Sequence, residues 1–254
     1  MVGRCSCFQL VAFSLHYYAV KMGGKGLGGK YMVQSKGWDW ENVNEAYRAT
    51  HLKPTEDCQH CAEIWKDIGY ASVLDLGAGL GRHSICFAKN GLNVSAIDIS
   101  EYGIKHLQSW AATESVEIET QIGDMLSLPY ADNSFDCVFA YHVISHSDTI
   151  GIKKIIKEIE RVLKPNGAVY LSFSSKGTDA FIEALRPKVD ENTMFWEGGP
   201  DVDGSPIFYA SISDIAELLS NFTINKIFQR EFCNNDADGS NRKSEYHYVS
   251  ATFI

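Results

Sequence analysis

The chain has 254 residues, of which 45% are hydrophobic and 22% are charged, and its formal net charge is -9. This composition is typical of a globular protein with one large α/β core, and it contains no apolar run of membrane-spanning length. An acidic chain lacks the basic surface that binds a phosphate backbone, so the charge argues against nucleic acid as the main partner and favours a small-molecule or protein substrate.

Residues 1–37 are predicted to form a flexible or peripheral leader. They contain the glycine-rich run "KMGGKGLGGKYM", and no clear small-x-small cleavage site follows the apolar start. Gly24, Gly29 and Lys30 match part of the phosphate-binding pattern G-x-x-x-x-G-K, but Tyr31 stands where Ser or Thr is needed. We therefore interpret this run as a linker rather than a nucleotide site.

The seven cysteines are an odd number in a chain without a convincing secretion signal, which favours reduced thiols and a cytoplasmic location. Cys58 and Cys61 have a spacing that can hold zinc, but a second ligand pair would have to come from the leader. Two helical residues facing a core explain the pair better, and we predict no metal site.

From residue 40 onward, helix and strand patterns alternate. Helices are predicted over 41–51, 58–69, 83–91, 100–113 and 151–163, and strands over 72–76, 93–98, 116–124, 135–142 and 168–174. Ser100 is placed as an N-cap, and residues 164–167 as a turn before the fifth strand. This alternation predicts a mostly parallel, doubly wound sheet with a ligand beyond the carboxyl ends of its strands.

The stretch "VLDLGAGLGRH", residues 73–83, places three glycines at the end of the first strand. Glycines at Gly77, Gly79 and Gly81 allow a tight turn and let a ligand lie against bare backbone near the start of the next helix. The dinucleotide pattern G-x-G-x-x-G requires glycine or alanine at position 82, where Arg82 stands. An NAD-dependent oxidoreductase is therefore a weaker alternative.

Two acidic residues follow the next two strands. Asp98 ends the second strand, where a carboxylate accepts both hydroxyls of a ribose, although it would also suit a cap for the following helix. Asp124 and Met125 follow the third strand, where they would contact an adenine, although Asp124 would also suit a turn. Together these positions predict an adenosyl ligand without a pyrophosphate.

Four motifs in order, "VLDLGAGLGRH", "VSAIDIS", "GDMLSLPYADNSFDCVFAYHVISH" and "LKPNGAVYLSF", resemble those of class I S-adenosylmethionine-dependent methyltransferases. They are most similar to the small-molecule branch that includes quinone-biosynthesis enzymes. The resemblance covers about residues 72–174. It implies a Rossmann-like sheet of seven strands with the last strand antiparallel, and so predicts the final two strands over 222–232 and 245–254.

The resemblance also implies the cofactor site. Gly77 and Gly79 would line the methionine portion, Ile99 would pack on the adenine, and Tyr141 or His142 would lie beside the sulfonium. Asp75 would bond the glycine-loop amides, and Arg82 would either pair with the ligand carboxylate or lie on the helix surface. The full predicted set is Asp75, Gly77, Ala78, Gly79, Gly81, Arg82, Asp98, Ile99, Asp124, Met125 and Tyr141.

His142 and His146 are the candidate general bases, since they lie one helical turn apart just beyond the fourth strand. Either would remove a proton if the methyl acceptor is protonated at the working pH, and either would also suit a structural role. Ser145, Ser147 and Asp148 make the surroundings of His146 polar, which favours that residue.

Residues 38–254 are predicted to form a single domain, with a lid or substrate insertion around 175–211 that carries Phe181, Phe195, Trp196, Phe208 and Tyr209. Trp38, Trp40 and Tyr47 resemble the N-terminal cover of related enzymes. The leading hypothesis is a methyltransferase that acts on a small organic acceptor. A cofactor-binding regulatory module without catalysis is the main alternative, and a homodimer is one option for the assembly.

Overall fold

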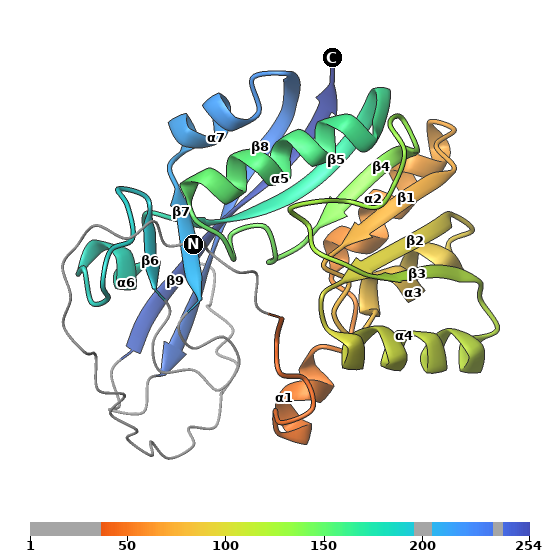
Figure 1. The fold of residues 1–254 in the computed structure, drawn as a ribbon, viewed down its shortest axis with the longest axis horizontal. Coiled ribbons are helices and arrows are strands. Elements are labelled where there is room, and N and C mark those ends of the chain that lie inside the picture. The colour runs from red at the N-terminus through yellow and green to blue at the C-terminus, as the bar shows by residue number, and fades with distance from the viewer. Residues whose placement is uncertain (1–36, 196–204, 236–240) are drawn as a thin grey trace, which may run out of the picture.

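The computed structural model describes residues 37–195, 205–235 and 241–254, which are built around one mixed β-sheet (Figure 1). Its strands are β1 (Ser72–Leu76), β2 (Asn93–Asp98), β3 (Ile118–Ile122), β4 (Phe135–Ala140), β5 (Leu163–Ser175), β6 (Thr193–Phe195), β7 (Pro206–Ala210), β8 (Phe222–Asn235) and β9 (Asn241–Phe253). Its helices are α1 (Glu45–Thr50), α2 (Glu56–Asp67), α3 (Arg82–Lys89), α4 (Glu101–Glu114), α5 (Thr149–Val162), α6 (Asp179–Ile182) and α7 (Ile212–Leu218).

The sheet follows the order β3-β2-β1-β4-β5-β7-β6, and β9 pairs with both β5 and β8. Strands β1 to β5 pair in parallel, whereas β9 runs antiparallel to β5. The predicted doubly wound sheet with an antiparallel last strand is therefore confirmed. The described residues form nine strands rather than seven, because the connection around 175–211 contributes β6 and β7.

Helices cover both faces of this sheet. On one face, α5 and α7 pack their isoleucines against alternate residues of the strands, such as Leu74 and Val138. On the other face, α2 and α3 pack against Val73 and Phe139, with α4 beside them over β2 (Figure 1). Because both faces are buried, the central strands carry continuous apolar runs rather than alternating ones.

The ends of the elements follow their capping residues. Ser100 caps α4 as predicted and accepts a hydrogen bond from the Gly103 amide. Helix α5 begins at Thr149, two residues earlier than predicted, because the Asp148 carboxylate caps it and accepts from the Gly151 amide at 2.7 Å.

The predicted turn over 164–167 is instead an irregular part of β5. Phe135 of β4 pairs with Leu163, but Cys137 pairs with Ala168, so the extra residues bulge out of the ladder. Asn166 takes a positive φ of 63° within this bulge, which is a conformation that asparagine tolerates well.

The buried Cys58 and Cys61 of α2 lie in the core cluster against Cys86, as the helical interpretation predicted. Among the described residues, no three histidine, cysteine or acidic side chains are placed to hold a metal ion. None of the described helices is long and apolar enough to cross a membrane. The glycine-rich run of the leader lies outside the described residues, as does Trp196.

Candidate active site

A cavity of about 470 Å³ lies at the carboxyl ends of the central strands, where the topology predicts a ligand. Its walls come from residues 37–51, from the ends of β1 to β5, from the connection around 175–211 and from β9. Most of the predicted cofactor residues line it, as do both predicted histidines: Gly77, Ala78, Arg82, Asp98, Ile99, Asp124, Met125, Tyr141, His142 and His146. Asp75, Gly79 and Gly81 are not among the residues that line the cavity, and their contact with a cofactor stays a prediction.

Gly77 is the glycine of the turn that faces the cavity. Its φ of 74° lies in the left-handed region, and its amide donates to the Ile97 carbonyl at 2.8 Å. A Cβ at this position would lie 2.2 Å from a methyl carbon of Val143. Glycine is therefore required here both for backbone conformation and for close approach of the segment after β4.

The other two glycines serve the packing of the protein itself. A Cβ on Gly79 would lie 3.3 Å from the Trp40 ring, and one on Gly81 would lie 2.3 Å from Leu107 of α4. Gly81 is also the N-cap of α3, with a φ of 94°. These positions were predicted from a pattern that does not distinguish a ligand from a neighbouring side chain.

Asp75 lies beneath the glycine turn and is almost completely buried. Its Oδ2 accepts a hydrogen bond from the Ser84 hydroxyl at 2.5 Å, so it is bonded to the first turn of α3 rather than to the glycine-loop amides. Burial raises the pKa of Asp75 to about 6. Its role is to fix α3 against β1.

Asp98 ties the glycine turn to the end of β2. Its Oδ2 accepts from the Gly79 amide at 2.8 Å and its Oδ1 accepts from the Ser100 amide at 2.8 Å. Burial raises the pKa of this carboxyl group. Each carboxylate oxygen has a second lone pair, so the group can still accept hydroxyl donors from the cavity that it lines.

Asp124, Met125 and Ile99 lie together on the β3 side of the cavity. The Asp124 Oδ1 accepts from the Leu126 amide at 2.8 Å, which fixes the start of the loop after β3. Met125 packs against the main core, and Ile99 leaves 38% of its surface exposed. An apolar slot with a carboxylate at its edge is suited to a purine ring with an amino group.

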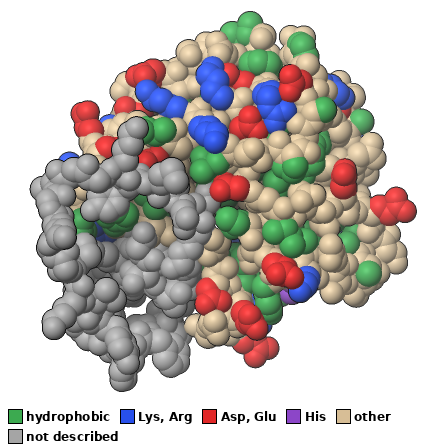
Figure 2. Space-filling model, in the orientation of Figure 1, with side chains coloured by type: hydrophobic (Ala, Val, Ile, Leu, Met, Phe, Trp, Pro, Cys, Tyr) green, Lys and Arg blue, Asp and Glu red, His purple; other side chains and the backbone are tan. Residues whose placement is uncertain are grey.

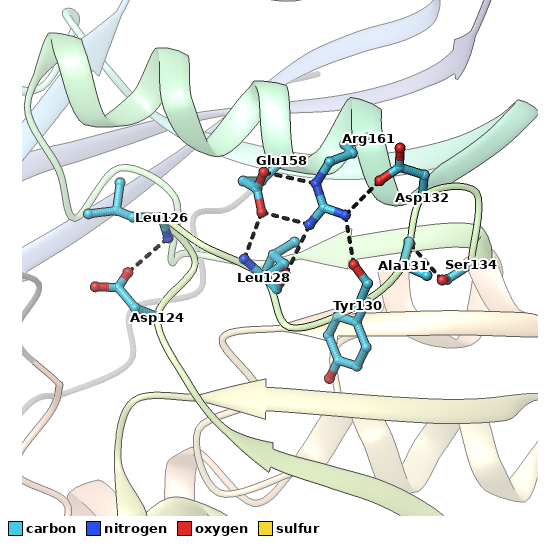
Figure 3. Close-up of polar contacts among 9 residues, drawn as sticks. All are labelled: Asp124, Leu126, Leu128, Tyr130, Ala131, Asp132, Ser134, Glu158 and Arg161. Atoms are coloured by element: carbon cyan, nitrogen blue, oxygen red, sulfur yellow. Dashed lines mark hydrogen bonds and ion pairs between the residues drawn. The ribbon is translucent and has the colours of Figure 1, made fainter.

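The loop that carries Asp124 is held to α5 by a pair of charged residues that the sequence did not reveal (Figure 3). Glu158 accepts from the Leu128 amide at 2.7 Å, and Arg161 donates to the carbonyls of Leu128 and Tyr130 at 2.9 and 2.7 Å. The two side chains also pair with each other at 2.8 Å. Because the loop has little secondary structure, these contacts supply much of its order.

Replacing Arg161 with glutamine is expected to lower the free energy of unfolding by about 1–3 kcal/mol, because two partly buried loop carbonyls and Glu158 lose their donor. Hydrogen exchange should also quicken in residues 124–134. The matched control is Lys157→Gln on the same helix, which removes only an exposed ion pair with Glu160. If urea denaturation shows that the two variants lose the same amount of unfolding free energy, the assigned role of Arg161 is wrong.

His142 lies at the end of β4 in a left-handed conformation with a φ of 54°. Its amide donates to the Ser172 hydroxyl at 2.6 Å, and its Nε2 lies 2.7 Å from the Tyr248 hydroxyl. The ring stacks on Tyr246 with the ring centroids 4.1 Å apart. Burial lowers the pKa of His142 to about 3, so the imidazole is neutral.

His146 also lines the cavity, as does His142, and the residues between the two histidines are not helical. The segment between them is a turn, because Ser145 is tied to the sheet through the Ser174 and Phe208 amides at 2.9 and 2.8 Å. The Nδ1 of His146 is buried and has no hydrogen-bond partner among the described residues. Burial lowers the pKa of His146 to about 4.

These lowered pKa values predict acid sensitivity. The folded chain binds fewer protons at His142 and His146 than the unfolded chain, whose histidines titrate near pH 6.5. Stability is therefore complete above that pH and falls as the pH drops toward 4, by about 2 kcal/mol for each histidine at pH 5. Urea denaturation at pH 7.5, 6 and 5 measures the fall.

The variant His146→Gln should lose less stability than the parent between pH 7.5 and 5, because its side chain has no proton to bind. His60→Gln, at an exposed position on α2, is the control. The assignment fails if the His146→Gln profile runs parallel to that of the parent.

An aromatic cover, defined as Trp38, Trp40, Tyr47 and His51, lines the side of the cavity nearest the glycine turn. The Trp38 ring stacks on Trp40 and Tyr47 with centroids 5.2 and 6.0 Å apart, and its edge meets His146 at 6.1 Å. The three aromatic residues therefore lie where the N-terminal cover was predicted.

Arg82 is the first residue of α3 and lies half-buried at the cavity wall. Its guanidinium carbon is 5.8 Å from the centroid of the Tyr141 ring. Among the described residues, it makes no hydrogen bond or ion pair. A cation placed in this way, beside the glycine turn, is suited to a ligand carboxylate.

The opposite end of the cavity comes mostly from residues that the sequence did not single out. They lie on β5, on the connection after it and on β9: Ser172, Ser174, Thr178, Ala180, Arg186, Ile207, Tyr209, Arg242, Lys243, Ser244 and Tyr246. Of the aromatic residues predicted for this connection, Tyr209 lines the cavity, whereas Phe208 is in the main core and Phe181 packs against Tyr209. The unusual length of the connection was the signal that pointed to this region.

Residues 74–171 match the profile of a family described as a methyltransferase domain. The chain is 32% identical over 140 residues to a glycine/sarcosine/dimethylglycine N-methyltransferase from Actinopolyspora halophila, a match that covers 54% of this chain and 23% of that protein. The chain thus spans less than half the length of this curated relative.

Two solved structures share the fold. A SAM-dependent methyltransferase from Methanosarcina mazei has a TM-score of 0.63 at 20% identity, over 80% of this chain and 99% of that chain. A 1,6-didemethyltoxoflavin-N1-methyltransferase from Burkholderia thailandensis, solved with its substrate and S-adenosylhomocysteine, has a TM-score of 0.55 at 18% identity, over 78% and 79% of the two chains. These two structures show that the chain has the fold of these methyltransferases, and residues 74–171 carry its sequence match to a methyltransferase domain.

Proposed function

We propose that the chain is an S-adenosylmethionine-dependent methyltransferase that acts on a small organic acceptor. The observation that carries this proposal is a single cavity that is lined both by Gly77, Asp98 and Asp124 and by the two histidines, His142 and His146. The named substrates of the relative from Actinopolyspora halophila and of the toxoflavin enzyme are also small molecules.

The residues at the first end fit the cofactor. Asp98 offers free lone pairs for the ribose hydroxyls, and the slot between Ile99 and Met125 suits the adenine beside Asp124. Gly77 and Ala78 would border the methionine portion, and Arg82 would hold its carboxylate. The same positions leave no feature that calls for a pyrophosphate, which supports this cofactor over NAD.

The bound cofactor supplies an electrophilic methyl group on a sulfonium. The chain then has to align the acceptor, exclude water and accept a proton where the acceptor carries one. The aromatic cover on one side of the cavity and the connection around 175–211 on another exclude water. Alignment falls to the residues beside Tyr141, at the end of β4.

His146 is the better candidate for the base. The Nε2 of His142 is already bonded to the Tyr248 hydroxyl at 2.7 Å, and this bond occupies the atom that would have to accept the proton. His142 would instead position the acceptor through its stacking on Tyr246. A neutral imidazole at physiological pH is ready to accept a proton, although its low pKa makes it a weak base.

A labelled-methyl transfer screen over a metabolite library tests the function, with calorimetry of S-adenosylhomocysteine and NAD beside it. We expect S-adenosylhomocysteine to bind and NAD not to bind. His146→Ala should slow transfer to an acceptor that is protonated at the assay pH and leave transfer to an ionised acceptor unchanged. Binding of S-adenosylhomocysteine without transfer to any acceptor would favour a regulatory module instead.

We also propose a single domain over residues 38–254 and a cytoplasmic location. Among the described cysteines, four are buried within one core, which suits reduced thiols. On the face shown in Figure 2, acidic and basic side chains alternate over α5 and α7, and Lys153 pairs with Glu217 and Lys157 with Glu160. A mixed surface of this kind supports a small-molecule substrate over nucleic acid.

A further inference from the structure

The imidazole ring of His142 is covered by an aromatic ring on each face. The rings of Tyr141 and Tyr246 stack on it with centroids 4.3 and 4.1 Å from its own, and their planes are tilted from the imidazole plane by 26° and 17°. Two nearly parallel rings cannot both lie this close to the same face, so one lies on each. The ring of His142 can therefore meet a ligand only through its edge.

The edge of this ring carries two nitrogens with different surroundings. The Nε2 lies 2.7 Å from the hydroxyl of Tyr248, whereas the Nδ1 makes no hydrogen bond with any residue that the structure describes. His142 lines the cavity, and burial lowers its pKa so far that the imidazole is neutral. A neutral imidazole has a single N–H, so the bond to Tyr248 decides whether the Nδ1 is a donor or an acceptor.

The surroundings of Tyr248 favour its hydroxyl as the donor in this bond. The hydroxyl of Tyr141 donates to the oxygen of Tyr248 at 3.3 Å, which leaves the proton of Tyr248 for His142. Burial raises the pKa of both tyrosines, so both hydroxyls keep their protons. The distance of 2.7 Å is also short for a ring N–H donor, whose bonds to oxygen are most often about 2.9–3.0 Å long.

Arg230 on β8 strengthens Tyr248 as a donor. Its guanidinium carbon lies 4.8 Å from the centroid of the Tyr248 ring, and a cation in this position draws electron density from the ring. Arg230 acts against the effect of burial on the pKa of Tyr248, as expected of a cation that makes the hydroxyl more acidic. The buried Asp57 of α2 holds the guanidinium in place by accepting from both of its terminal nitrogens, with Nη2 at 2.7 Å from Oδ1.

We propose that Tyr248 donates to the Nε2 of His142 and keeps the ring proton on Nδ1, from which His142 donates a hydrogen bond to the methyl acceptor. His142 then binds a carbonyl or ionised oxygen of the acceptor and is not the base. Tyr248, Arg230 and Asp57 act through His142 and are positioning residues. This inference rests on the proposed function, because it assigns a role to one wall of the same cavity.

Nuclear magnetic resonance of protein labelled with 15N at its histidines tests the position of the proton, with and without S-adenosylhomocysteine. The nitrogen that carries the proton has a chemical shift distinct from that of the bare nitrogen, and His142→Gln assigns the signals. We expect the proton of His142 on Nδ1. Tyr248→Phe should allow the Nε2–H form to appear, because the hydroxyl that donates to Nε2 is gone.

Tyr170→Phe is the matched control. Tyr170 is also buried in this aromatic cluster, with its ring centroid 6.4 Å from that of Tyr248, and its hydroxyl makes no hydrogen bond to His142. The substitution removes a buried hydroxyl from the same cluster, so it reproduces any general effect on packing. The proton of His142 should stay on Nδ1 in this variant.

Labelled-methyl transfer to the metabolite library measures the effect on the reaction. Tyr248→Phe should lower kcat/KM for the acceptor by about 5- to 30-fold, the effect of one lost hydrogen bond, and leave the binding of S-adenosylhomocysteine unchanged. Arg230→Gln should lower it by only about 2- to 5-fold, since the hydroxyl remains. Arg230→Lys keeps the positive charge and should recover part of this loss.

The proposal is overturned if His142 carries its proton on Nε2, because Nδ1 would then be a proton acceptor. It is also overturned if Tyr248→Phe leaves the proton on Nδ1 alone, or if Tyr248→Phe and Tyr170→Phe slow transfer equally. None of these outcomes affects the binding of S-adenosylhomocysteine, so the proposed function would stand. Failure of S-adenosylhomocysteine to bind to the parent protein would instead contradict the proposed function, and the spectrum of the unloaded protein would still decide the position of the proton.

Discussion

Asp98→Ala is expected to bind S-adenosylhomocysteine about 100- to 1000-fold more weakly than the parent, as measured by calorimetry. The substitution removes a carboxylate that lines the cavity and that we propose accepts the ribose hydroxyls. It also removes the acceptor for the Gly79 and Ser100 amides, so the glycine turn loses its tie to β2. Both losses act on the same ligand, which is why the expected effect is large.

Two controls separate these losses. Asp98→Asn keeps one carbonyl oxygen for an amide and should bind the ligand with an intermediate affinity. Asp67→Ala, at an exposed position at the end of α2, removes an acidic residue far from the cavity wall and should leave binding unchanged. If the Asp98→Ala variant binds S-adenosylhomocysteine as tightly as the Asp67→Ala variant does, Asp98 does not belong to the cofactor site.

Gly77→Ala is expected to lower the free energy of unfolding by about 4 kcal/mol or more, because the new methyl group would overlap Val143 in a conformation that already disfavours it. Gly69→Ala supplies a matched comparison. Gly69 has a φ of 92°, similar to the 74° of Gly77, but nothing lies within 4 Å of the position of its Cβ. Gly69→Ala should lower the free energy of unfolding by only about 1–2 kcal/mol, because the left-handed backbone conformation alone disfavours the new side chain.

Urea denaturation measures the loss of unfolding free energy in both variants. The loss in Gly77→Ala minus the loss in Gly69→Ala is the part that comes from steric overlap with Val143. Adding Val143→Ala to Gly77→Ala should recover part of the lost stability, because it removes the overlapping methyl carbons. If Gly69→Ala and Gly77→Ala lower the free energy of unfolding by similar amounts, Val143 does not pack closely against the glycine turn.

The central sheet could be predicted because each of its strands and helices is indicated by residues that are close together in the sequence. Each of the central parallel strands is a short apolar run, and the sequence marks the start of α4 by the capping residue Ser100. The strand ends then follow from the topology, so Gly77, Asp98 and Asp124 could be assigned to one cavity before any contact was known.

The sequence does not show the contacts that residues make with partners distant in the chain. Gly79 and Gly81 fit the pattern of a ligand loop, but Trp40 and Leu107 occupy the space beside them. His142 and His146 have helical spacing, but the hydrogen bonds of Ser145 to Ser174 and Phe208 hold the segment in a turn. Contacts of this kind produce no periodic pattern in the sequence, so they could not be predicted from it.

The residues that match the methyltransferase profile end at 171, just before Ser172 in the middle of β5. The first half of this strand belongs to the shared core, whereas its second half pairs with β7 and borders Arg186, Tyr209 and Tyr246. One continuous strand thus joins the part of the sheet that matches the methyltransferase profile to the part that lies beyond the match. Under the proposed function, we expect substitutions beyond position 171 to alter the acceptor end of the cavity and to leave Gly77, Asp98 and Asp124 in place.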